Sequence, residues 1–148
     1  MRIGGPEVLL EPNAAQALAV TLHELATNAA KYGSLSVPNG QIDLSWSHQD
    51  DRLNLRWTEM GGPPVQAPTH RGFGGRIIEQ MIGQLKGETR FDWRPQSLIC
   101  QTTLACNKTA LDQPGRGPSA ARPSSLEALS EAINSDARRR AAFHSSKT

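Results

Sequence analysis

The stretch AAQALAVTLHELATNAAKYG, from Ala14 to Gly33, gives the first indication of the architecture of this chain. Its Ala and Leu content, with no Gly or Pro before Gly33, predicts one long helix from Ala14 to Tyr32. Asn13 is a favourable residue for the N-cap of this helix. One side of the helix is apolar and has to pack against a second layer. That side consists of Leu18, Leu22, Leu25 and Ala29.

The segments after this helix alternate between apolar and polar residues, which predicts strands with one buried face. Ile42, Leu44 and Trp46 share one parity, and the stretch from Leu53 to Trp57 repeats the pattern. The residues from Gln49 to Asp51 fit a hairpin turn between them, although not a tight Asn-Gly one.

A second helix is predicted from Arg76 to Leu85, because its apolar residues recur at helical spacing. Two strands are predicted after it, from Glu88 to Trp93 and from Leu98 to Ala105, and a short strand from Val8 to Leu10 precedes the first helix. This order predicts an α/β sandwich of two layers, in which a mixed, mostly antiparallel sheet carries helices on one face.

The composition restricts the class of protein. A chain of 148 residues can bury a core without disulfides or metals, and a net charge of +2 is too small to indicate a nucleic-acid-binding surface. The sequence shows neither a secretory signal nor an apolar stretch long enough to span a membrane. With only Cys100 and Cys106 as cysteines, we therefore expect a reduced, cytoplasmic setting.

The chain divides into two parts by composition. We predict a folded domain over residues 1–106 and a flexible linker and tail over residues 107–148, since the tail opens with Pro, Gly, Ser and Arg. Ser124 and Glu127 can form a capping box, so a marginal helix over residues 124–143 is expected, with a thin apolar stripe.

Three polar residues, Glu24, Asn28 and Lys31, fall in line beside the apolar side of the first helix. An amide oxygen is a hard ligand for Mg²⁺, a Lys is a point charge for phosphate, and a carboxylate can orient a metal-bound water or accept a proton. The row therefore suits a magnesium nucleotide. On its own, such a row is most often a solvated face with weak side-chain pairs.

Glu59 is a carboxylate at an unexpected position. It continues the parity of the apolar residues from Leu53 to Trp57, so a regular strand would bury it. A buried carboxylate needs a partner, and the amino group of a ligand would be one. The alternative is that the strand ends at Trp57 and Glu59 reaches water.

Glycines stand at both ends of the segment between this strand and the second helix. Gly61-Gly62 directly follows the strand, and the stretch from Gly72 to Gly75 directly precedes the helix. Glycines let the backbone approach a ligand closely, and a helix N-terminus attracts phosphate. The segment from Pro63 to Arg71 could cover a bound ligand and add donors to a phosphate, or it could be a simple surface loop.

Together these pieces resemble the catalytic domain of the HWE class of bacterial sensor histidine kinases. The stretch HELATNAAKYG, from His23 to Gly33, is similar to the N box of that class. WTEMGGP, from Trp57 to Pro63, is similar to its first glycine box, and Gly72-Phe73-Gly74 is similar to its second. The letters of the class are matched by His23, Trp57 and Glu59.

This resemblance, which runs from about Gly4 to Ala105, implies a Bergerat-type ATP-binding fold like that of gyrase, Hsp90 and MutL, with ATP and Mg²⁺ as ligands. It implies that Asn28 coordinates Mg²⁺, Lys31 contacts phosphate and Glu59 accepts a hydrogen bond from the adenine amino group. The implied ATP-binding residues are Asn28, Lys31, Tyr32, Glu59, Gly61, Gly62, Gly72, Phe73 and Gly74.

The implied catalytic residues are His23, Glu24, Asn28 and Lys31. Glu24 lies where related ATPases keep a general base, whereas His23 fits a structural hydrogen bond as well as a catalytic role. Phosphoryl transfer suits such a site, because positioning and charge stabilisation do most of the catalysis.

Kinases of this class phosphorylate a histidine on a separate helical hairpin, which we do not find in this sequence. The expected function is that of a two-component histidine kinase domain acting on a phosphoacceptor histidine in another domain or chain. Two alternatives remain open: a kinase acting in trans in the manner of anti-sigma-factor kinases, and a module that binds nucleotide or a response regulator without catalysis. None of these interpretations expects a nucleic-acid partner.

Overall fold

The computed structural model describes residues 1–69, 72–106 and 124–145 of the chain. The elements in chain order are β1 (Arg2–Gly4), β2 (Leu9–Leu10), α1 (Pro12–Lys31), a short 3₁₀ helix η1 (Ser34–Ser36), β3 (Gln41–Gln49), β4 (Arg52–Met60), α2 (Phe73–Gln84), β5 (Glu88–Arg94), β6 (Ser97–Ala105), β7 (Ser124–Ser125) and α3 (Leu126–Ser145).

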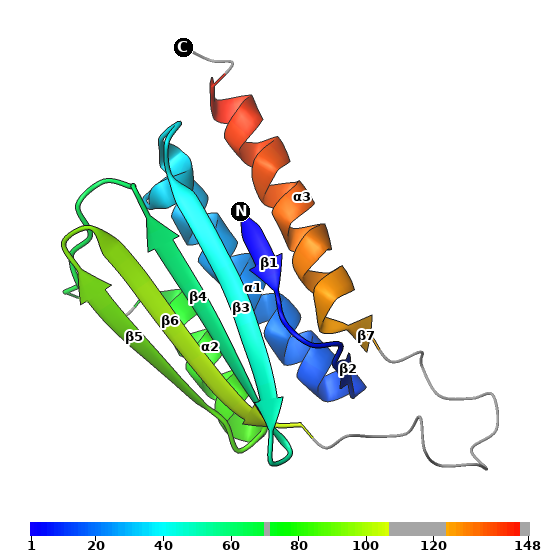
Figure 1. Cartoon of the computed structure of the whole chain (residues 1–148). Coiled ribbons are helices and arrows are strands. Elements are labelled where there is room, and N and C mark those ends of the chain that lie inside the picture. The colour runs from blue at the N-terminus through cyan, green and yellow to red at the C-terminus, as the bar shows by residue number, and fades with distance from the viewer. Residues whose placement is uncertain (70–71, 107–123, 146–148) are drawn as a thin grey trace.

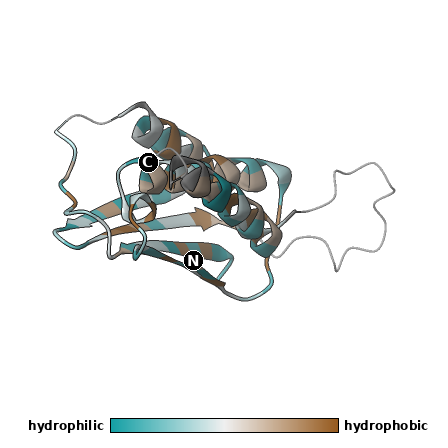
Figure 2. Ribbon diagram, turned by 90° about the horizontal axis from the view of Figure 1, so that it is seen from above, coloured by the Kyte–Doolittle hydropathy of each residue, from teal (hydrophilic) through white to brown (hydrophobic). Residues whose placement is uncertain are grey.

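The main sheet has five strands in the order β1-β3-β4-β6-β5 (Figure 1). β1 pairs with β3 in parallel, and every other neighbouring pair in this sheet is antiparallel. The helices gather on one side of the sheet, as the view from above shows (Figure 2). The predicted fold class, a two-layer sandwich with a mixed, mostly antiparallel sheet, is therefore confirmed.

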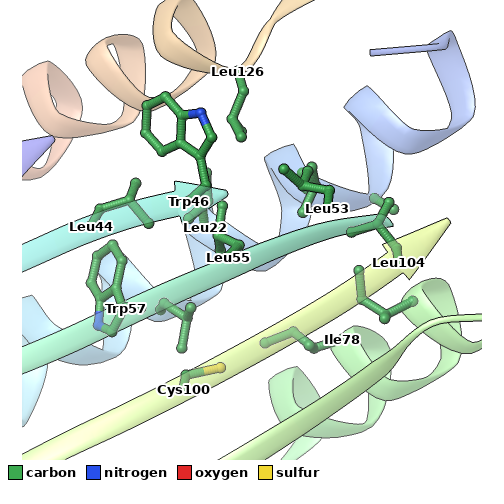
Figure 3. Packing of buried hydrophobic residues seen from close by; sticks show 14 of the residues in the cluster. Leu22, Leu44, Trp46, Leu53, Leu55, Trp57, Ile78, Cys100, Leu104 and Leu126 are labelled. Carbon is green, nitrogen blue, oxygen red and sulfur yellow. The ribbon is translucent and has the colours of Figure 1, made fainter. Parts of the chain in front are cut away.

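The core lies between the sheet and α1, where the predicted apolar positions meet. The inward residues of β3 and β4 alternate with exposed or half-buried ones, as expected for strands with one covered face. Leu22 of α1 packs among these strand residues, together with Leu55 and Trp57 (Figure 3). Each large side chain buried in this way stabilises the fold by about 1.5–3 kcal/mol.

One local prediction was wrong, and another was right in kind but not in length. The helix α1 begins at Pro12 with Glu11 as its N-cap rather than Asn13, because the fixed φ of Pro suits the first helical position. The predicted hairpin turn between β3 and β4 is confirmed, but it is shorter than predicted, since Gln49 pairs directly with Arg52. Asp50 and Asp51 between them have φ of 51° and 58°, a left-handed conformation that Asp tolerates and that two-residue hairpins require.

The described part of the tail packs onto the rest of the chain. α3 contacts α1 and β1, and β7 pairs with β2 in a small second sheet. Leu126 is fully buried (0% exposed), Ala137 is also buried, and Leu129 and Ile133 pack against the same core. The thin apolar stripe of this helix is thus sufficient to join it to the domain, whereas residues 107–123 of the predicted linker lie outside the described residues.

Leu126→Ala is expected to lower the free energy of unfolding by about 2–4 kcal/mol, because it removes a fully buried side chain at the start of α3. Urea denaturation followed by circular dichroism measures this change. Glu131→Ala, at an exposed position of the same helix, is the control and should change the stability by less than about 0.5 kcal/mol. Equal midpoints for the two variants would show that α3 does not pack on the domain.

Candidate functional site

A pocket of about 780 Å³ opens between α1, α2, the segment after β4 and the inner face of β5 and β6. The first side of its lining comes from α1, the residues just after it and β4: Glu24, Leu25, Asn28, Tyr32, Gly33 and Glu59. The second side comes from residues 64–68, the start of α2 and the sheet: Gly72, Gly74, Gly75, Ile78, Glu79, Thr89, Phe91, Trp93 and Leu98. A separate hollow of about 480 Å³ on the outer face of the sheet contains none of the predicted site residues.

The structure brings several of the predicted site residues into this one pocket: Glu24, Asn28, Tyr32, Glu59, Gly72 and Gly74. Phe73 lies between the last two, as the first residue of α2. His23 and Lys31 are exposed residues of α1 and do not contribute to the lining. His70 and Arg71, at the end of the segment predicted to cover a ligand, lie outside the described residues.

Gly61 and Gly62 do not line the pocket but pack behind it. Gly61 has a φ of 69°, which side chains rarely tolerate. A Cβ atom at Gly62 would lie 2.8 Å from both Cα and the backbone N of Ser34. The first glycine pair therefore lets the end of β4 pack closely against the turn that follows α1.

Glu59 is buried on the inner face of β4. The strand continues to Met60, so Glu59 does not escape to water, and it is only 3% exposed. Its Oε1 accepts a hydrogen bond from Trp57 Nε1 at 3.1 Å, and its Oε2 accepts one from the backbone N of Ser34 at 3.0 Å. Each carboxylate oxygen keeps further acceptor capacity, because an ionised carboxylate offers about four lone-pair sites.

Two opposing effects act on the pKa of Glu59. Desolvation by burial is the larger effect and raises the pKa above its ordinary value of 4.5, while the hydrogen bonds from Ser34 and Trp57 lower it. Gly33 makes this arrangement possible, because a Cβ atom at that position would overlap Glu59 Oε2.

The start of α2 meets α1 at Glu24. A Cβ atom at Gly74 would overlap Glu24 Oε2, so a side chain at this position would displace the Glu24 carboxylate. The first turn of a helix has free N–H groups and a partial positive charge. Glu24 therefore lies at the place in the pocket where an anionic ligand could accept hydrogen bonds from the backbone.

Sequence reasoning missed the aromatic wall of the pocket. Phe91 and Trp93 stack with ring centroids 5.8 Å apart and an interplanar angle of 19°, and Trp93 is 36% exposed. Val65 donates a backbone hydrogen bond of 3.2 Å to the Pro95 carbonyl, which holds the segment after β4 next to this wall. The shared parity of Thr89, Phe91 and Trp93 was the signal available in the sequence.

The charged side chains in the described lining are all acidic: Glu24, Glu59 and Glu79. A cation near Glu24 and Asn28 would favour an anionic ligand in this pocket, because it offsets the repulsion from Glu24. In the part of the chain that the structure describes, no three His, Cys, Asp or Glu side chains converge to hold a metal by themselves. None of the described helices has the length and apolar character needed to cross a bilayer.

Comparison with known proteins identifies the class. No family model matches the chain. It is 43% identical over 103 residues to blue-light-activated histidine kinase 1 of Erythrobacter litoralis, which covers 68% of this chain and 29% of the relative. It is 39% identical over 104 residues to the blue-light-activated histidine kinase of Brucella anthropi, which covers 67% of this chain and 21% of that relative. The chain thus spans less than a third of the length of these relatives.

Solved structures agree on the fold. The blue-light-activated histidine kinase EL346 of Erythrobacter litoralis superposes with a TM-score of 0.61 at 17% identity, covering 70% of this chain and 34% of that chain. The histidine kinase AdeS of Acinetobacter baumannii gives a TM-score of 0.51 at 19% identity, covering 62% of this chain and 47% of that chain. The fold is that of the ATP-binding domain of histidine kinases. Within this class, the chain is homologous to the catalytic domain of the HWE-type kinases, which confirms the resemblance in the sequence.

Stability is expected to depend on pH through Glu59. Because burial raises its pKa, the folded domain holds this proton more tightly than the unfolded chain does. The stability from this group is fully present at low pH and is lost as the pH rises through the raised pKa. Relative to Glu59→Gln, which cannot ionise, the wild type should become less stable as the pH rises through the raised pKa of Glu59.

Urea denaturation of both proteins from about pH 4 to about pH 8 measures this difference. A difference in unfolding free energy that stays constant over this range, or that moves in favour of the wild type, would contradict the assigned desolvation of Glu59.

Proposed function

We propose that this chain binds Mg·ATP and transfers the γ-phosphate to a histidine on a separate domain or chain, as the catalytic domain of a two-component histidine kinase. The observation that supports this most directly is the meeting of Glu59 and Asn28 in one pocket. Homology to histidine kinases supports ATP as the ligand of that pocket.

The nucleotide lies with its purine towards Glu59. The buried carboxylate accepts a hydrogen bond from the adenine amino group, and an ionised carboxylate is a stronger acceptor than a neutral group. Leu25, Ile78 and Leu98 offer apolar contacts to the ring, and the stacked Phe91 and Trp93 offer aromatic ones.

The phosphates lie towards Asn28 and the first turn of α2. Backbone N–H groups at Gly74 and Gly75 are available to phosphate oxygens, as at other helix N-termini that bind anions. Lys31 is one helical turn beyond Asn28 and is exposed, so its flexible side chain can reach a phosphate. Tyr32 is 75% exposed at the rim and can cover the nucleotide.

A magnesium ion fits this part of the pocket. Asn28 provides an amide oxygen, a hard ligand, and the acidic lining disfavours a triphosphate without a cation. When bound, Mg²⁺ would neutralise phosphate charge. Glu24, one turn before Asn28, is placed to orient a water on the metal or to accept a proton. For His23, an exposed residue outside the lining, both a structural and a catalytic role stay open.

The acceptor histidine belongs to another domain or another chain. His48 lies at the far end of β3, where its Nε2 is 2.7 Å from the Cys106 carbonyl oxygen, so it is held away from the pocket. The relatives are longer than the matched region, which leaves room in them for an acceptor domain. A cytoplasmic location, expected from the two free cysteines, is part of the same proposal.

Asn28→Ala is expected to weaken Mg-dependent ATP binding by about tenfold or more without unfolding the domain, since it removes a ligand to the metal from an exposed position. Asn13→Ala, an exposed asparagine in the first turn of the same helix, is the matched control and should bind like the wild type. Calorimetric titrations with and without Mg²⁺ measure both. Unchanged affinity in Asn28→Ala would contradict the metal role.

Transfer is tested by incubating the wild type and both variants with γ-labelled ATP, Mg²⁺ and a separate kinase hairpin carrying its acceptor histidine. Label on the hairpin with the wild type and Asn13→Ala, but not with Asn28→Ala, supports the kinase. Nucleotide binding without label would instead support a binding module, and absence of nucleotide binding would overturn the proposed function.

A further inference from the structure

Glu59 accepts one hydrogen bond on each carboxylate oxygen, and the two donors differ in kind. The Ser34 donor is a backbone N–H, which any residue at that position would supply. The Trp57 donor is the indole Nε1–H, 3.1 Å from Oε1, which only the side chain provides. Trp57 therefore supplies a side-chain donor to this carboxylate, and the Ser34 side chain also favours its charged form.

Trp57 is itself held rigidly. It is fully buried (0% exposed) on β4, two residues before Glu59 on the same face of the strand. β4 lies between β3 and β6, where Trp57 is opposite Leu44 and Cys100, so its backbone is fixed from both sides (Figure 3). The indole ring is fully buried, and its Nε1–H donates to Glu59.

We propose that Trp57 is the positioning residue of the nucleotide site: its indole N–H, which donates to Oε1, holds the Glu59 carboxylate aimed for the purine amino group. This inference rests on the proposed function and deepens it. It gives Trp57, the first residue of the WTE stretch, a role in addition to packing in the core. The hydrogen bond from Trp57 favours the charged form of Glu59 against the desolvation that opposes it.

Other ionisable groups also face Glu59. Their effects on the pH dependence of nucleotide binding have to be distinguished from the effect of Glu59. Cys100 of β6 is buried, and burial raises its pKa to about 12, so it stays a neutral thiol. Glu24 of α1, Glu79 of α2 and Tyr32 lie across the pocket. All of these residues are present in the wild type and in a Trp57 variant, so a ratio of affinities compares two proteins that differ at one position.

The test substitutes Trp57→Phe, which keeps an aromatic ring and removes the donor. Its matched control is Trp46→Phe on β3, where the lost indole N–H donates to the Pro6 carbonyl at 2.8 Å and does not touch the pocket. Dissociation constants for Mg·ATP are measured for the wild type and both variants from about pH 5 to about pH 8. Circular dichroism and urea denaturation check that each variant is folded.

Trp57→Phe should bind about tenfold more weakly than the wild type at neutral pH, and the ratio should grow as the pH falls, because the pKa of Glu59 rises without its donor. Trp46→Phe should give a ratio near one at every pH. A ratio for Trp57→Phe that is flat with pH would mean a packing role only and would overturn the inference. Failure of the wild type to bind nucleotide would instead count against the proposed function.

A second measurement on the wild type applies even if Trp57→Phe does not fold. The chain has three tryptophans, so ¹⁵N labelling gives three indole N–H signals, which spectra of Trp46→Phe and Trp93→Phe assign. The Trp57 signal should shift both with protonation of Glu59 and on addition of Mg·ATP. A Trp57 signal that does not move while nucleotide affinity falls with pH would contradict the inference.

Discussion

A carboxylate buried on the apolar face of a sheet is the constraint around which this molecule is arranged. Taking an ionised Glu59 out of water is costly unless donors replace the lost hydration. Trp57 supplies one donor from the same strand, and the backbone of Ser34 supplies the other from the turn that follows α1. Satisfying Glu59 therefore ties the end of α1 to the end of β4, and the pocket forms where they meet.

The same constraint explains why the glycines divide into two groups. Gly33 and Gly62 lie where the turn after α1 and the end of β4 touch, and a side chain at either position would collide with Glu59 or Ser34. Gly72 and Gly74 instead line the pocket at the start of α2, where backbone rather than side chains faces the ligand site. The first group shapes the end of the pocket that contains Glu59, and the second shapes the end at the start of α2.

Elements with a sustained period were predictable from the sequence, because many residues contribute to each signal. The alternation through Leu53, Leu55 and Trp57 was enough to place Glu59 on the inner face of β4. β1 and β7 have too few residues to show a period. The turn at Asp50 and Asp51 depends on a positive φ, which Asp tolerates but which the presence of Asp in a sequence does not predict. The aromatic wall of Phe91 and Trp93 was missed because alternation shows which side of a strand a residue faces, but not that β5 borders a cavity.

The proposed nucleotide site depends on a hydrogen bond from the amino group of adenine to the Glu59 carboxylate. The most direct test compares the binding of ATP with that of purine riboside triphosphate, which lacks only this amino group, to the wild-type chain in the presence of Mg²⁺. If Glu59 accepts this hydrogen bond, ATP should bind at least about tenfold more tightly than purine riboside triphosphate, because only ATP has an amino group that can donate to the buried acceptor. Equal affinities for the two nucleotides would contradict it.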